Sequence, residues 1–83
     1  MSKKVDYSIK FYKGFMTNDN DETYNFYLAA RTATEAYTFL ENHVRKHANK
    51  YHIILGEVDI CNIRIEEVSL ESYGKRYGFE VIN

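Results

Sequence analysis

Three histidines and one cysteine lie in the middle and second half of this chain, and imidazole and thiolate groups are the ligands that zinc prefers. His43 and His47 are four residues apart in a segment with helical spacing, which places both rings on one side of a helix. His52 and Cys61 are conceivable third and fourth ligands. No glutamate stands between the two helical histidines, so the H-E-x-x-H spacing of a metalloprotease is absent. Packing at the edge of the core and a favourable charge at a helix C-terminus explain the same histidines, and we expect no metal.

An oxygen-rich segment earlier in the chain has the residue types of a calcium loop. It consists of Asn18, Asp19, Asn20, Asp21 and Glu22. The glycine and the distant bidentate glutamate of an EF-hand loop are missing. Because Asn and Asp are ordinary turn residues, we interpret this segment as a solvated hairpin turn.

Motifs for catalysis are absent from the sequence. There is no G-x-S-x-G elbow and no glycine-rich loop that leads into a helix. Cys61 lies in an apolar strand pattern, which predicts an inert core thiol. Acidic pairs such as Glu66 and Glu67 are typical of a solvated strand and its edge. We therefore expect no enzymatic activity and no cofactor.

The segment from residue 57 to residue 71 is acidic and carries Arg64 as its one basic residue. Its carboxylates are Glu57, Asp59, Glu66, Glu67 and Glu71. Displayed along a strand, they would suit the basic nucleic-acid groove of a partner. The simpler interpretation is that they keep an exposed strand soluble and discourage edge pairing.

Tyrosines near basic residues point to a second kind of surface. Residues 75–82 match the RNA-recognition signature in part, but that fold needs a further helix and strand after the signature, so the match identifies no family. Stacking rings beside positive charge would still suit single-stranded nucleic acid. The residues predicted for such a surface are Lys10, Tyr12, Tyr27, Lys75, Arg76 and Tyr77, the first three on the outward side of a hairpin.

Length and composition favour one small domain that spans residues 1–83. Hydrophobic residues make up 45% of the chain, which is enough for a core, and the net charge of -1 nominates no nucleic acid by itself. A single cysteine excludes an intrachain disulfide, and the N-terminal residues lack the apolar run of a signal peptide. We expect a cytoplasmic protein without a membrane partner.

Two strands are predicted before the first helix. Residues 5–12 alternate with period two, and the pattern places Val5, Tyr7, Ile9 and Phe11 on the buried face and Tyr12 on the outer face. Gly14 marks a break or bulge. Alternation resumes from Tyr24 to Ala30, which predicts an antiparallel hairpin closed by the polar turn.

The helix has the clearest local signal in the sequence. Thr32 and Glu35 form an S/T-x-x-E capping box, and apolar residues then follow helical spacing. Basic residues close the helix, which suits its dipole. The stripe predicted to be buried comprises Ala36, Phe39, Leu40, His43, Val44 and His47.

The remainder of the chain predicts extended structure with one short helical turn. Residues 53–66 alternate with a slip near Cys61, which fits either one bent strand or two short strands with a tight connection. Of the two we favour one bent strand. Ser69 to Gly74 is typical of a helical turn, and Phe79 to Ile82 of a final edge strand. The expected fold is α+β in two layers: one helix on a mostly antiparallel sheet of three to four strands, with its other face open.

Eight tyrosines and segregated charges favour a surface for protein contacts. We expect a small protein-binding module that occupies a site on a larger host protein or nucleoprotein complex, as small phage-encoded inhibitors do. Single-stranded nucleic-acid binding and a structural homo-oligomer are the alternatives. The chain is accordingly expected to be a monomer or a homodimer.

Overall fold

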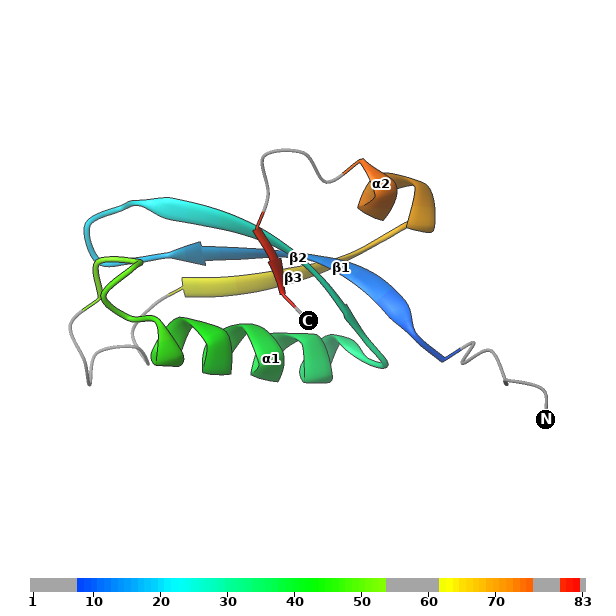
Figure 1. Ribbon diagram of the computed structural model, residues 1–83, viewed down its shortest axis with the longest axis horizontal. Coiled ribbons are helices and arrows are strands. Elements are labelled where there is room, and N and C mark those ends of the chain that lie inside the picture. The colour runs from blue at the N-terminus through cyan, green and yellow to red at the C-terminus, as the bar shows by residue number, and fades with distance from the viewer. Residues whose placement is uncertain (1–7, 54–61, 76–79, 83) are drawn as a thin grey trace.

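The computed structural model describes residues 8–53, 62–75 and 80–82, and shows a four-stranded sheet with a helix packed on one face (Figure 1). The elements in chain order are β1 (Lys10–Thr17), β2 (Thr23–Ala30), α1 (Ala33–Lys46), β3 (Asn62–Val68), α2 (Leu70–Gly74) and β4 (Glu80–Ile82). The strand order is β3-β1-β2-β4, antiparallel except for the parallel pair β2 and β4. The predicted α+β fold, with its short final edge strand, is confirmed. The predicted extended segment at residues 54–61 lies outside the described residues.

Helix α1 begins where the capping box predicts. The hydroxyl of Thr32 accepts a hydrogen bond from the Glu35 backbone N–H at 3.0 Å, and the Glu35 carboxylate accepts one from the Arg31 N–H at 2.9 Å. The hydrogen bond of the Glu35 side chain is therefore made with Arg31, one residue before the N-cap Thr32. Among the described residues, no helix has the length and apolar character needed to cross a membrane.

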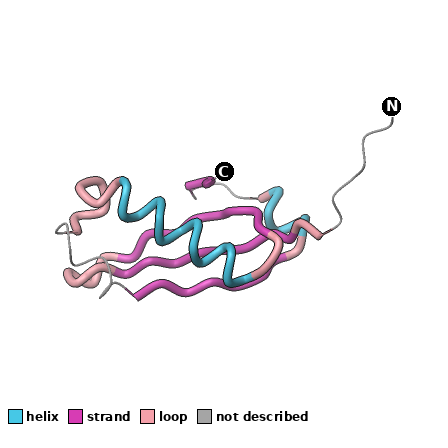
Figure 2. The backbone as a smooth tube through the Cα atoms, turned by 90° about the horizontal axis from the view of Figure 1, so that it is seen from below, coloured by secondary structure: helices cyan, strands magenta, loops and turns pink. Residues whose placement is uncertain are grey.

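The core lies between α1 and the sheet, and Figure 2 shows α1 crossing over the strands. Ala36, Leu40 and Val44 form the buried stripe of the helix. Gly14 lets β1 approach α1 closely, because a Cβ atom built there would lie 2.7 Å from Leu40 Cδ2. The side chains that the sheet and the segments after α1 contribute to this core are Tyr12, Met16, Phe26, Leu28, Ala30, Ala48, Tyr51, Ile53 and Ile82.

Strand β1 corrects the sequence prediction in both extent and phase. It runs through Gly14 without a bulge, since each residue from Lys10 to Thr17 pairs in register with β2. Tyr12, predicted to face outward, is 2% exposed beneath α1, whereas Phe11 lies half-buried on the opposite face. The prediction failed because aromatic residues occupy both faces of the strand, so alternation by itself does not give the phase.

The second face of the sheet is covered at one end by α2. The Tyr73 ring of α2 packs on Phe11 and Tyr27 with ring centroids 4.5 and 5.7 Å away. Tyr27 is consequently only 4% exposed, although it lies on the outward face as predicted. Beyond α2 on this face, the Arg64 guanidinium lies 4.9 Å from the centroid of the Phe15 ring.

The turn between β1 and β2 is organised by a buried amide, not by solvent. Asn18 is 4% exposed; its Nδ2 donates to Glu22 Oε1 and to the Tyr51 carbonyl, each at 2.9 Å. Its Oδ1 accepts from the backbone N–H groups of Asn20 and Glu22 at 2.9 and 3.0 Å. Asn18 therefore ties the hairpin to the segment that follows α1, and its oxygen is not available to a cation.

Candidate functional site: the groove between α1 and β4

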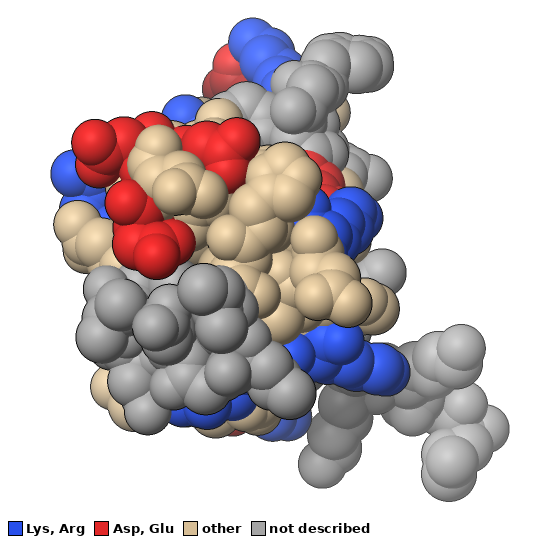
Figure 3. Space-filling view, turned by 90° about the vertical axis from the view of Figure 1, so that its left-hand side faces the viewer, with Lys and Arg blue, Asp and Glu red and all other residues tan. Residues whose placement is uncertain are grey.

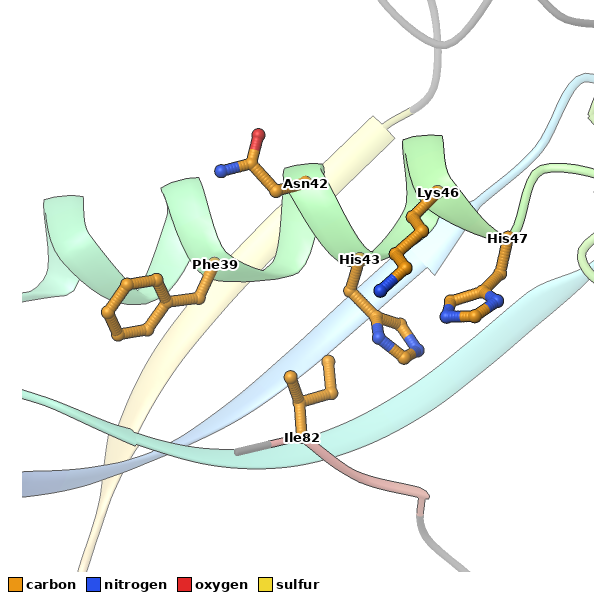
Figure 4. A pocket seen from close by; sticks show the side chains of 6 residues that line it. All are labelled: Phe39, Asn42, His43, Lys46, His47 and Ile82. Atoms are coloured by element: carbon orange, nitrogen blue, oxygen red, sulfur yellow. The ribbon is translucent and has the colours of Figure 1, made fainter.

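A pocket of about 360 Å³ lies between one flank of α1 and the last strand. Phe39, His43 and His47 project from α1 toward β4, where the Ile82 side chain points back at the helix (Figure 4). Asn42 and Lys46 complete its lining. Phe39 is 42% exposed and His47 is also exposed, which corrects their predicted place on the buried stripe. The groove thus combines an apolar floor with polar and basic groups at its rim.

Strand β4 is held beside α1 by one carboxylate. Glu80 Oε2 lies 2.8 Å from His43 Nε2 and accepts a hydrogen bond from the Tyr51 hydroxyl at 2.7 Å. Glu80 Oε1 lies 3.2 Å from Lys50 Nζ. His43 Nε2 also lies 2.8 Å from the Tyr51 hydroxyl. These contacts join the end of α1, the segment after it and β4, and they fix one wall of the groove.

The network sets the protonation of its own members. Burial by itself raises the pKa of Glu80, but hydrogen bonds from Tyr51, His43 and Lys50 outweigh burial, and the net pKa of Glu80 is lowered. Burial and the nearby carboxylate raise the pKa of Tyr51, so this hydroxyl stays protonated and donates. A carboxylate only accepts, so the hydrogen in the contact between His43 and Glu80 is assigned to His43 Nε2.

The polar groups of this network are engaged with one another. The Tyr51 hydroxyl is committed to Glu80 and its ring packs edge-on against Phe26 and Tyr24 with centroids 5.5 and 5.1 Å away. Both Glu80 oxygens are occupied by partners within the fold. The network is therefore saturated by its own contacts, and the groups it offers to a ligand are those on the groove rim.

The histidines separate into two places. The rings of His43 and His47 lie side by side with centroids 4.8 Å apart. His52 instead bonds through Nδ1 to Glu22 Oε1 at 3.0 Å and to the Tyr24 hydroxyl at 3.2 Å. The described residues contain no group of three His, Cys, Asp or Glu side chains that would hold a metal ion, and Cys61 lies outside them.

The predicted acidic surface is only partly assembled. Glu66 and Glu67 are exposed neighbours on β3, and the strand alternation turns them to opposite faces of the sheet. Glu71 is exposed on α2 and lies 3.4 Å from Lys75 Nζ. Glu57 and Asp59 lie outside the described residues. At the β1–β2 end of the molecule, a further group of acidic side chains gathers on one side (Figure 3); the carboxylates of that turn are Asp19, Asp21 and Glu22.

The predicted nucleic-acid surface is not assembled among the described residues. Tyr12 is in the core and Tyr27 is covered by α2, so neither ring presents a free stacking face. Lys10 and Lys75 are exposed, and Arg76 and Tyr77 lie outside the described residues.

Sequence reasoning missed Glu80, Tyr51 and Lys50 as a unit. Their contacts join residues 29 to 37 positions apart, so no local spacing announces them. The His43 and His47 pair was the one detectable signal, and it marks the groove wall.

The comparisons with known proteins give no match: no family model, curated protein or solved structure is significantly similar to this chain. The groove is therefore interpreted from its own geometry.

Proposed function

We propose that this protein is a small non-enzymatic binding module and that its α1–β4 groove receives a short segment of a larger protein. The observation that carries the proposal is Phe39, a large apolar side chain left 42% exposed beside Ile82 in a groove with a basic rim. An exposed aromatic next to a pocket is a typical anchor point for a partner side chain.

The charge around the groove defines the occupant. Arg45 and Lys46 lie in the last turn of α1, His47 follows them, and Lys50 comes shortly after. The carbonyl end of a helix attracts such cations. Arg45 lies 3.6 Å from the Glu41 carboxylate and Lys50 pairs with Glu80, so Lys46 is the lysine that supplies positive charge in the groove lining. The best-fitting segment has one apolar side chain for the Phe39–Ile82 floor and carboxylates for the rim.

The proposal is tested by NMR, which detects whether short peptides bind in the groove. Isotope-labelled protein is titrated with short peptides that combine Leu or Phe with Asp or Glu, and with matched peptides that carry Lys. We expect the acidic peptides to shift the signals of Phe39, His43 and Ile82, with weaker binding at high salt.

The matched control is a second exposed aromatic on the same helix. Tyr37 is 40% exposed against 42% for Phe39. Phe39→Ala should abolish peptide binding and Tyr37→Ala should leave it unchanged. Equal loss in both variants, or equal binding of acidic and basic peptides, would contradict the groove proposal.

A second candidate function is an inhibitor whose own acidic side chains fill a basic groove of its target. It is supported by the exposed carboxylates of Glu66 and Glu67, which have no ion pair with any described residue.

The test is to purify the tagged protein from a bacterial host with and without nuclease treatment. A discrete partner that is retained after nuclease by wild type and by Asp19→Lys, but lost by Glu67→Lys, supports this candidate function. Retention by all three rejects it, and material lost on nuclease treatment favours nucleic-acid binding.

A further inference from the structure

Strand β3 leaves one edge without a described partner strand. It pairs with β1 on one side, and no other described strand lies along its second side. β3 is seven residues long and most of its side chains are exposed. Such an edge presents unpaired backbone donors and acceptors, which favour pairing with another strand.

Two opposite charges lie on this edge, and neither has an ion pair among the residues that the structure describes. Arg64 and Glu66 lie on the same face of the sheet because they are two residues apart on one strand. Arg64 contacts the Phe15 ring, and neither charge forms an ion pair with any described residue. Lys13 is the cross-strand neighbour of Glu66, but its ammonium lies 6.0 Å from the Phe15 ring centroid and 5.9 Å from that of Tyr27.

We propose that β3 pairs antiparallel with β3 of a second copy, about a two-fold axis that passes through Ile65. In this register Arg64 of each copy stands directly opposite Glu66 of the other, so one sheet face gains two reciprocal ion pairs. Ile65 stands opposite Ile65 on the helix side. Moving the axis to Glu66 would oppose two glutamates, and moving it to Arg64 would oppose two arginines. The strand is thus self-complementary in one register and repulsive in the two nearest ones.

The seam, where the two β3 strands would meet, is apolar on its helix side as well. A two-fold axis perpendicular to the sheet keeps both α1 helices on the same face, one on each side of the seam. Phe39 marks the flank of α1 toward β4, and Tyr37, roughly half a turn away, is on the flank toward β3. Tyr37 is 40% exposed and Ile63 and Ile65 are half-buried, so pairing would remove further apolar surface from water.

The test is the oligomeric state of charge-swapped full-length chains. Sedimentation equilibrium from micromolar to millimolar protein should show a wild-type dimer. Arg64→Glu and Glu66→Arg should each weaken dimerisation by about tenfold or more, because each replaces two attractive pairs with two like-charge pairs. The double variant R64E/E66R restores opposite charges and should dimerise like wild type. Asp19→Arg changes charge as Glu66→Arg does, at the far hairpin turn, and should leave the dimer intact.

Three outcomes would overturn the proposal: a strictly monomeric wild type, a dimer that both single variants leave unchanged, or a double variant that stays as weak as either single one. Circular dichroism of each variant separates lost pairing from lost folding. The groove lies toward the other edge of the sheet, so peptide binding at Phe39 is measured independently of dimerisation. Failure of one proposal therefore leaves the other standing.

Discussion

Asn18 shows how one side chain connects two parts of the fold. Its amide donates to Glu22 and to the Tyr51 carbonyl and accepts from two backbone N–H groups. Asn18→Asp keeps the shape but loses the donor and places a second carboxylate beside Glu22. We expect a loss of about 1–3 kcal/mol of unfolding free energy, measured by urea denaturation. Asn20→Asp adds the same charge in the same turn on an exposed side chain and should change stability little; equal losses would contradict this role.

Gly14 is the second residue whose identity is fixed by space. A methyl group there would lie 2.7 Å from Leu40 Cδ2, and Leu40 is fully buried. Gly14→Ala should destabilise the protein by about 1–3 kcal/mol through overpacking. In a double-mutant cycle, Leu40→Ala should relieve part of that loss because it empties the contested volume. Gly74→Ala meets nothing within 4 Å and should be neutral or slightly stabilising, so a similar cost at both glycines would refute the steric explanation.

Strand β4 is three residues long, and the Glu80 contacts anchor it to α1. Because the pKa of Glu80 is lowered in the folded state, its stabilising effect is present above the unfolded pKa, near 4.5, and is lost as pH falls through the folded value. We expect hydrogen exchange at Ile82 to accelerate below that pH before exchange in β1 does. Glu80→Gln should show the fast exchange at neutral pH, while Glu67→Gln, an exposed carboxylate, should not. If backbone amides in β1 and β4 begin to exchange faster at the same pH, β4 does not open separately from the rest of the sheet.

The elements that the sequence predicts well have local signals. Thr32 and Glu35 start α1, and Ser69 and Gly74 bound α2, because caps and turns are set by residues three to five positions apart. The phase of β1 was mispredicted because Tyr12 and Phe11 are both large and aromatic. Which of them is buried depends on α1 and α2, which pack on opposite faces and follow later in the chain.

The groove could not be predicted from the sequence for a related reason. Its apolar floor needs Phe39 and Ile82 on facing elements, and its wall needs Glu80 beside His43. Both follow from the parallel pairing of β4 with β2, which joins residues more than 50 positions apart. Strand pairing of this separation leaves no periodic trace in either segment.

At the scale of the whole molecule, the groove and the β3 edge lie at opposite ends of the strand order β3-β1-β2-β4. Pairing through β3 would therefore place two identical grooves at the far edges of one continuous sheet, where they touch neither the seam nor each other. We expect two peptides per dimer with equal affinity, and calorimetry should give the same peptide dissociation constant for wild type and for Arg64→Glu at a concentration at which that variant is monomeric. Phe39→Ala should likewise leave the dimer constant unchanged. A change of more than about threefold in either direction would reveal coupling through the sheet, since distant sites normally add within about 0.5 kcal/mol.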